Sequence, residues 1–329
     1  FSPAGTSAVK MLAPDARIYG LGQRMGFLNK RGEITTQWAT DDPLHHPGRD
    51  AMYQAIPFYL ALQRAGAYGL LLDSPACTRF DLGKSHPERV RFQIAEDELD
   101  YYVIVAATPK EVLIRYTELT GRMPLPPKWS LGYHQSRWSY YPESRVREIA
   151  NTFRAKQIPC DVIHLDIDYM DGYRVFTWDR ERFPNPEQLL SDLKAMGIRV
   201  VTIVDPGVKV DPDYRIYQEG VARGYFATMT TSEVYVGRVW PGEAAFPDFL
   251  QAGTRRWWGE QHAEFLTLGV AGFWNDMNEP ANFTEPEVTG PFKGTVPGDV
   301  LQGEPGSKQP HALVHNLSLI HISEPTRPY

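Results

Sequence analysis

The sequence lacks several features that would assign it to a class at once. Its 329 residues include only two cysteines, Cys77 and Cys160, which is too few for a disulfide framework or a spaced metal site. No apolar run approaches the roughly 20 residues that cross a bilayer. A net charge of −6 without a basic cluster argues against nucleic acid as the main partner. What remains is the ordinary composition of a globular protein.

The two ends of the sequence are unusual. The first residue is Phe1 rather than Met, and no signal peptide is visible, so we expect that the natural start is missing. The cytoplasm is the favoured compartment, with a removed secretion signal as the alternative. The last stretch, LSLIHISEPTRPY (317–329), has no helix period and no cap. It resembles a translated sequencing adapter, and we leave it out of the fold prediction.

Residues 1–105 are predicted to form short β-strands. They contain no helix-period segment, and turn-forming residues such as 64–66 separate the apolar stretches. An antiparallel β-sandwich fits this pattern. A long loop over 24–55, with His45, His46, Arg49 and Asp50, is expected to interrupt the strands. The expected strands are ARIYGLG (16–22), IPFYLAL (56–62), AYGLLLD (67–73), RVRFQIA (89–95) and LDYYVIVA (99–106).

A proline-rich stretch, GRMPLPPKW (121–129), follows a short helix predicted at 109–119 and indicates a domain junction. Beyond it the pattern alternates four times between strand and helix. Val146, Ile149, Ala150 and Phe153 share one helical face, and Gly197 is placed to close a helix. The expected strands are 129–135, 161–167, 199–205 and 270–274, and the expected helices are 142–157, 186–196, 213–223 and 254–268.

Apolar strands covered by amphipathic helices indicate a parallel sheet. Four such units are half of a (β/α)8 TIM barrel, which takes about 250 residues. We therefore predict a β-sandwich over 1–122, the first half of a barrel over 123–316 and a non-native tail over 317–329. Half a barrel would expose two sheet edges, so the chain by itself is expected to be inactive and prone to aggregation.

Charged and aromatic side chains gather where the predicted barrel strands end. Catalytic groups of a (β/α)8 barrel lie at the carboxyl ends of its strands. Clustered carboxylates beside aromatic rings suit glycoside hydrolysis, and carboxylates alone also suit a divalent metal. The residues at these ends are His134, Arg137 and Trp138, then Asp166, Asp168 and Asp171, then Asp205, and finally Trp274, Asp276, Asn278 and Glu279.

Asp276 is the strongest of these candidates. It follows an apolar strand and sits among Phe273, Trp274 and Met277, where a charge without partners is costly. No helix start nearby gives it a capping role. The same argument favours Asp166, whereas Asp179 and Asp211 are better explained as helix caps or turn residues.

The stretch that contains Asp276, GFWNDMNEPANF (272–283), resembles the nucleophile segment of glycoside hydrolase family 31, the α-glucosidase family. Other stretches resemble that family in the same order, and together they run from about residue 16 to Asn316. They are YGLGQRMGFLNKRG (19–32), WATD (38–41), LTGRMPLPPKWSLGYH (119–134), HLDIDYMDGYRVFTWD (164–179) and VWPGEAAFPDF (239–249).

The resemblance implies a β-sandwich of the galactose-mutarotase type before the barrel, and retaining hydrolysis of α-linked glucosides. Asp276 would be the nucleophile that forms a β-glycosyl-enzyme intermediate, and Glu279, one helical turn further on, an orienting partner. Asp166 would hold hydroxyls on the far side of the glucose ring. The remaining implied substrate contacts are Trp240, Trp274, Met277, Val208, Trp138 and Asp41, although Trp138 could instead pack in the core and Asp41 depends on a loop from the sandwich.

The sequence departs from the family in one respect. A retaining enzyme needs a second carboxyl group about 5–5.5 Å from the nucleophile, and the family supplies it on a later Trp-x-Gly-Asp segment that is absent here. Glu285, Glu287, Asp299 and Glu304 lie in a Gly/Pro-rich context without that pattern, so no general acid is assigned.

Several alternatives remain open from the sequence. Within the family they are α-xylosidase, transglycosylase and α-glucan lyase. Outside it they are a metal enzyme using Asp166, Asp168, Asp276 and His164, and a non-catalytic carbohydrate-binding relative. We expect no cofactor, no metal, no nucleic acid and no membrane partner. Oligomeric state, linkage preference and chain-length preference are left open.

Overall fold

The computed structural model describes residues 5–41, 46, 48–95, 98–283 and 294–317. The predicted tail therefore lies outside the described residues from 318 on, as do His45, Glu285 and Glu287. The chain divides into two compact units, which are described one at a time. The first unit includes 5–123, 279–300 and 309–317, and the second includes 124–278 and 301–308.

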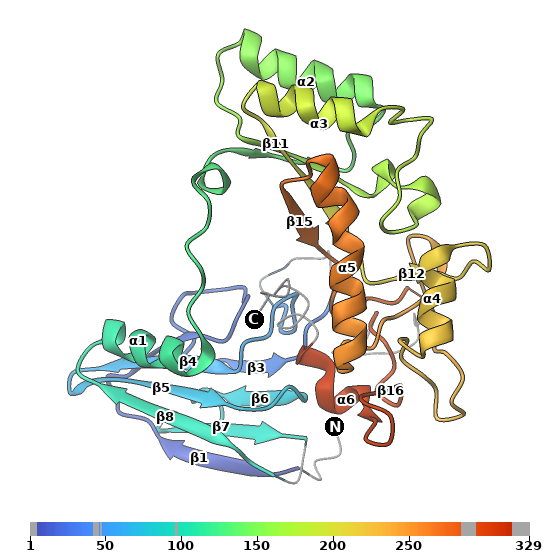
Figure 1. Cartoon of the computed structure of the whole chain (residues 1–329). Coiled ribbons are helices and arrows are strands. Elements are labelled where there is room, and N and C mark those ends of the chain that lie inside the picture. Colours follow the sequence, from blue (N-terminus) through green and yellow to red (C-terminus); the bar gives the residue numbers. More distant parts are fainter. Residues whose placement is uncertain (1–4, 42–45, 47, 96–97, 284–293, 318–329) are drawn as a thin grey trace. The chain divides into compact units, whose positions relative to one another are not determined.

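The first unit contains two four-stranded antiparallel sheets (Figure 1). One sheet has the order β1-β7-β6-β3 and the other β2-β4-β5-β8. The strands are β1 (Ser7–Met11), β2 (Arg17–Gly20), β3 (Ile34–Gln37), β4 (Phe58–Gln63), β5 (Gly66–Leu72), β6 (Thr78–Asp81), β7 (Arg89–Ile94) and β8 (Tyr101–Ala106).

Alternation along β4 explains how this unit packs. Tyr59 and Ala61 join the core that β6 and β7 complete with Phe80 and Phe92. The intervening residues, represented by Phe58, face helix α1 (Pro109–Thr120), where the Phe58 ring stacks on Tyr116 with 4.0 Å between centroids. Strand β4 therefore has both faces covered, which accounts for its unbroken apolar run. Helix α1 begins with a capping box between Thr108 and Glu111.

The strand prediction for this unit was incomplete. The five predicted strands are present as β2, β4, β5, β7 and β8, but β1, β3 and β6 were missed. Strand β3 lies inside the stretch predicted as a long loop, so that prediction was wrong. Its sequence, ITTQ, is too polar to signal a strand, because the buried Thr35 and Gln37 replace the usual apolar residues.

The end of the described chain returns to this first unit. Helix α6 (His311–Val314) and the 3-10 turn that follows it, His315–Leu317, bring two histidines into its core. His311 Nε2 and His315 Nδ1 lie 2.8 Å apart, and the His315 ring stacks on Trp38 with 3.6 Å between centroids.

These buried histidines predict a loss of stability in mild acid. Burial lowers the pKa of His311 to about 3, and burial together with the charge of His311 lowers the pKa of His315. In the unfolded chain both pKa values are near 6.5. The stability that depends on neutral rings is therefore complete above about pH 6.5 and is lost as the pH falls towards 3. We expect the free energy of unfolding to fall by about 1.4 kcal/mol per histidine between pH 7.5 and pH 5.5.

Urea unfolding of the complete polypeptide that the gene encodes, the full gene product, measures this loss. Replacing His311 by Gln removes one titrating ring and should make the pH dependence shallower. A free energy of unfolding that stays flat between pH 7.5 and pH 5.5 would contradict the prediction.

The second unit is built on a parallel sheet with the strand order β15-β11-β10-β9. Each of these four strands lies beside the one that precedes or follows it in this set along the chain, as expected for successive β/α repeats. Helices α2 and α3 lie side by side in Figure 1. The strands are β9 (His134–Gln135), β10 (Val162–Leu165), β11 (Arg199–Val204) and β15 (Gly272–Asn275), and the helices are α2 (Glu143–Ala155), α3 (Pro186–Ala195), α4 (Arg215–Arg223) and α5 (Ala252–Leu268).

An antiparallel sheet with the order β12-β14-β13 completes the second unit. Its strands are β12 (Val208–Lys209), β13 (Val236–Val239) and β14 (Gly242–Ala245). The short strand β16 (Leu301–Gln302) also belongs to the second unit, whereas β17 (Gln309–Pro310) belongs to the first. Strands β13 and β14 lie between α4 and α5 in the chain.

The four predicted helices of the second unit are confirmed to within two residues at each end. Gly197 follows α3 with φ of +75°, as a left-handed helix end requires. The strand predicted at 129–135 was wrong over most of its length. Residues Lys128–Leu131 form a 3-10 helix in which Ser130 donates to the carbonyl of Pro127, so only His134–Gln135 remains as strand.

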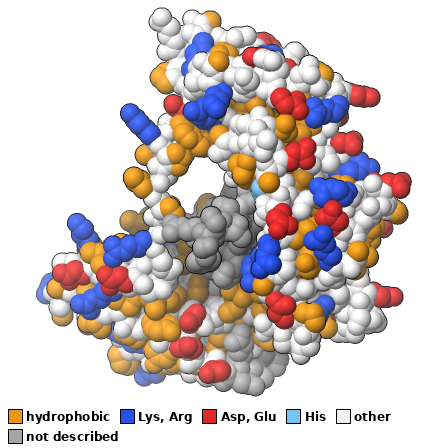
Figure 2. All heavy atoms as spheres, in the orientation of Figure 1, with side chains coloured by type: hydrophobic (Ala, Val, Ile, Leu, Met, Phe, Trp, Pro, Cys, Tyr) orange, Lys and Arg blue, Asp and Glu red, His pale blue; other side chains and the backbone are white. Residues whose placement is uncertain are grey.

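Aromatic rings dominate the core of the second unit. The Trp178 ring stacks on Phe265 of α5 with 5.4 Å between centroids, and Tyr169 packs against both. On the face shown in Figure 2, Lys and Arg side chains are interspersed with Asp and Glu. Among the described residues, no helix combines the length and apolar character needed to cross a membrane.

Candidate functional site

Three aspartates follow three neighbouring strands of the parallel sheet. Asp166 comes directly after β10, Asp205 after β11 and Asp276 after β15. The register pairs Leu165 with Thr202 and Val204 with Asn275, so these strands end at one edge of the sheet. The prediction that Asp276 lies where a strand ends and a loop begins is confirmed.

Asp276 is half-buried, and burial raises the pKa of its carboxyl group. The backbone N–H of Met277 donates to that carboxylate and partly offsets the rise. Met277 is itself buried and has φ of +59°, a backbone conformation that costs a non-glycine residue on the order of 1 kcal/mol or more. The turn after β15 is therefore locally strained at the residue that hydrogen-bonds to Asp276.

Asp166 lies close enough to Asp276 and Asp168 for their negative charges to affect its pKa. Its side chain accepts a hydrogen bond from the Ile167 N–H at 2.8 Å. Burial raises the pKa of Asp166 most, and the negative charges of Asp276 and Asp168 raise it further. The strand ends thus gather three carboxylates in one electrostatic cluster.

Asp168 is held by three donors that fix its position. Its buried carboxylate accepts from Trp138 Nε1 at 3.1 Å, from the Tyr173 hydroxyl at 3.3 Å and from Arg182, an ion pair also at 3.3 Å. The bond to Trp138 orients an indole ring that is 63% exposed. The alternative that Trp138 packs in the core is therefore wrong.

A pair of exposed indole rings is the most open aromatic surface at this edge. The rings of Trp138 and Trp240 lie 5.5 Å apart between centroids, and Trp240 follows β13. Trp274 of β15 is half-buried, with its ring edge-on to His164. Val208, by contrast, has no exposed surface and belongs to the core.

The loop that follows β10 is tied to strand β11 and to the loop that follows β12. The Tyr169 hydroxyl donates to the carbonyl of Ile203 at 2.8 Å, and Arg174 pairs with Asp211 at 2.6 Å. The Tyr214 hydroxyl donates to the carbonyl of Val175. Each of these interactions joins the loop after β10 to a later segment of the second unit. Together they fix the loop that carries Asp166 and Asp168.

Two of the predicted site residues, Glu279 and Asp41, belong to the first unit. Glu279 is buried and Asp41 half-buried. The segment from Met277 to Pro280 is a turn rather than a helix. The expectation that Glu279 follows Asp276 by one helical turn was therefore wrong, because the left-handed Met277 cannot belong to a right-handed helix.

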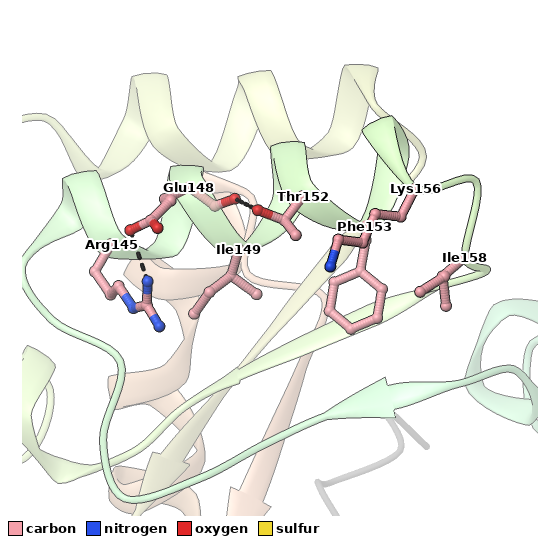
Figure 3. A pocket seen from close by; sticks show the side chains of 7 residues that line it. All are labelled: Arg145, Glu148, Ile149, Thr152, Phe153, Lys156 and Ile158. Atoms are coloured by element: carbon pink, nitrogen blue, oxygen red, sulfur yellow. Dashed lines mark hydrogen bonds and ion pairs between the residues drawn. The ribbon is translucent and has the colours of Figure 1, made fainter.

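A hollow in the second unit lies elsewhere, along one flank of α2 (Figure 3). It contains none of the predicted site residues. Its lining is Arg145, Glu148, Ile149, Thr152, Phe153, Lys156 and Ile158. Within the described ranges, no group of three or more His, Cys, Asp or Glu side chains is arranged to hold a metal ion.

Sequence reasoning missed two arrangements at this edge. One is the contact of Asp168 with Arg182, which lies 14 residues further along the chain, just beyond the motif at 164–179. The other is the pair His134 and His164 on adjacent strands, with His134 Nδ1 and His164 Nε2 3.0 Å apart. Both histidines lie within predicted strands, His134 at the end of 129–135 and His164 in the middle of 161–167, so the adjacency of these two strands was the available signal.

Comparison with family profiles gives two matches. Residues 123–327 match the profile described as the glycosyl hydrolases family 31 TIM-barrel domain. Residues 1–81 match the profile described as the glycosyl hydrolase 31 N-terminal galactose mutarotase-like domain.

Individual proteins give a consistent result. The chain is 49% identical over 318 residues to "Alpha-glucosidase 2" of Bacillus thermoamyloliquefaciens, covering 96% of this chain and 39% of that protein. It is 36% identical over 275 residues to an α-glucosidase of Saccharolobus solfataricus, covering 84% and 39%. The chain thus spans well under half the length of these relatives.

Solved structures resemble it as well. A family 31 dextranase of Flavobacterium johnsoniae in complex with isomaltotriose superposes with a TM-score of 0.87 at 30% identity, covering 98% of this chain and 38% of that one. A family 31 α-glucosidase of Bacteroides thetaiotaomicron gives a TM-score of 0.77 at 38% identity, covering 88% and 49%.

Proposed function

Because the chain belongs to glycoside hydrolase family 31, we propose that it is part of a retaining α-glucosidase and carries the catalytic nucleophile, Asp276. Residues 123–316 would supply the first four β/α units of the (β/α)8 barrel, and residues 1–122 the sandwich before it. Relatives named as α-glucosidases support the activity. The relative solved with isomaltotriose supports an α-linked gluco-oligosaccharide as substrate.

One observation carries the proposal. Asp276 and Asp166 follow different strands, yet the charge of one raises the pKa of the other. Two carboxylates at one strand edge can divide the work at a sugar ring, with one attacking the anomeric carbon and the other binding hydroxyl groups. The exposed rings of Trp138 and Trp240 nearby in the same unit offer flat apolar surfaces of the kind that pack against sugars.

In the first step an Asp276 carboxylate oxygen would form a bond to the anomeric carbon while the bond to the leaving oxygen breaks and that oxygen takes a proton from a general acid. In the second step a water oxygen would bond to the anomeric carbon, the bond to Asp276 would break, and the water would give a proton back to the same acid–base group. The nucleophile must be ionised, and burial works against ionisation because it raises the pKa of Asp276. The Met277 N–H is the donor that stabilises the charged form. No described residue is assigned as the general acid.

The remaining predicted residues would shape the sugar site. Asp166 would accept hydrogen bonds from hydroxyls far from the scissile bond, and Trp274 and Met277 would flank the nucleophile. Glu279 would act as an orienting partner and Asp41 would contact substrate from the sandwich. Val208 would support the wall of the sugar site from the core without touching the substrate, since its side chain is fully buried.

The test is the stereochemistry of hydrolysis by the full gene product. A panel of nitrophenyl α-glucoside, α-xyloside and β-glucoside is assayed with and without a chelator, and the first product is identified by proton NMR. We expect the α-glucoside to be preferred, α-glucose to appear before β-glucose, and the chelator to have no effect. First release of β-glucose, or loss of activity on chelation, would overturn the proposal.

A further inference from the structure

The segment Trp38–Asp41 directly follows strand β3 and is not itself part of a strand. Strand β3 is the last strand of its sheet, and its pairing with β6 ends at Gln37 and Thr78. Backbone groups beyond Gln37 need other partners, because an unpaired buried N–H or C=O is costly. Those partners come from residues far along the chain.

The Asn316 side chain binds the backbone on both sides of Trp38. Its Oδ1 accepts from the Ala39 N–H at 3.0 Å. Its Nδ2 donates to the carbonyl of Gln37 at 3.2 Å and to that of Ala76 at 3.3 Å. The backbone N–H of Asn316 donates to Pro75 at 3.1 Å. The amide therefore fits in one orientation only, since a flip would set its oxygen against two carbonyls.

His315 completes the set on the same segment. Its Nε2 donates to the carbonyl of Ala39 at 2.7 Å, and its Nδ1 faces His311. The ring stacks parallel on Trp38, with an interplanar angle of 1°. Thr40, the next residue, is held by a different segment: its N–H donates to the carbonyl of Met52 at 3.0 Å.

We infer that His315 and Asn316 are positioning residues for Asp41: they replace a missing strand partner and fix the backbone from Gln37 to Thr40, from which Asp41 projects. The inference rests on the proposed role of Asp41 in substrate binding. It assigns a function to the HN pair at 315–316, which lies at the end of the family resemblance.

The matched variants are His315→Phe and His315→Gln in the full gene product. Phenylalanine keeps the ring on Trp38 but cannot donate to Ala39, whereas glutamine places an N–H near the Nε2 position. Hydrogen exchange of peptides covering 34–41 should become at least tenfold faster in His315→Phe, and much of the protection should return in His315→Gln. Asn316→Asp, which sets a charge against two carbonyls, should behave as His315→Phe.

Kinetics separate positioning from a merely structural role. His315→Phe should raise KM for an oligosaccharide about tenfold with little change in kcat. Its effect should not add to that of Asp41→Asn, because both remove the same contact. His262→Phe, a ring substitution in α5 of the second unit, is the control and should leave both exchange at 34–41 and KM unchanged.

The two possible failures are distinguishable. Unchanged exchange at 34–41 in His315→Phe would overturn the inference alone. Faster exchange with unchanged KM would also overturn it, by leaving only a structural role. An unchanged KM in Asp41→Asn would overturn the proposed role of Asp41 and, with it, the inference.

Discussion

Replacing Asp276 by Asn should reduce kcat/KM for an aryl α-glucoside by about ten-thousandfold or more, which corresponds to roughly 5.5 kcal/mol. The amide keeps the size of the side chain but cannot attack the anomeric carbon. The smaller variant Asp276→Gly leaves room for azide, which should restore turnover and give a β-glucosyl azide, because azide enters from the face that the carboxylate occupied. Steady-state kinetics and product NMR measure both effects.

The control for this substitution is Asp171→Asn. Asp171 follows the same strand as Asp166, but its side chain is 64% exposed and makes only a 3.6 Å ion pair with Arg174, so activity should stay near that of the unaltered protein. A fluorinated glucosyl fluoride that traps the intermediate should label the peptide 272–283 in the unaltered protein. Full activity in Asp276→Asn, or a label on another peptide, would show that the nucleophile is a different residue.

Replacing Asp166 by Asn should reduce kcat/KM by roughly a thousandfold, if two hydrogen bonds to a charged acceptor are lost at about 2 kcal/mol each. The loss should be much smaller for a 4-deoxy glucoside, which lacks a hydroxyl on the far side of the ring. The values of kcat/KM are measured for the unaltered protein and for Asp166→Asn, each with the full glucoside and with the 4-deoxy glucoside. This cycle isolates the contact between Asp166 and the 4-hydroxyl group.

The same variant should shift the acid limb of the pH profile. Burial and the negative charges of Asp276 and Asp168 raise the pKa of Asp166, and a substrate contact that needs the ionised Asp166 carboxylate is lost when that group is protonated. Asp166→Asn removes this titrating group, so the apparent pKa of the acid limb of kcat/KM should fall and the remaining activity should persist to lower pH. An acid limb that stays in place, or an equal loss for the 4-deoxy substrate, would contradict the role proposed for Asp166.

The fold of the second unit was largely predictable because its signals are local. Apolar periodicity placed α3 and α5, and Gly197 and Gly269 mark their ends through left-handed φ values. In the first unit β3 escaped prediction because its register with β6 depends on tertiary pairing. Its inward residues are Thr35 and Gln37 rather than apolar side chains.

The site was predictable where a single strand end carried the signal. Asp276 and Asp166 follow apolar strands and could be located from sequence. The hydrogen bond from Trp138 to Asp168 could not, since it depends on side-chain geometry between two separate loops. The turn at Met277 could not be predicted either, because its positive φ occurs at a methionine and not at a residue type, such as glycine or asparagine, that favours this conformation.

The interactions that join the loop after β10 to strand β11 and to the loop after β12 limit how substrate preference could be changed by transplanting loops between relatives. The hydrogen bonds from Tyr169 to Ile203 and from Tyr214 to Val175 join different segments. The ion pair of Arg174 with Asp211 does the same. One loop moved alone would arrive without its partner and leave a buried hydroxyl or charge unmatched in the recipient. Chimaeras should therefore exchange 166–182 together with 203–214 as one block.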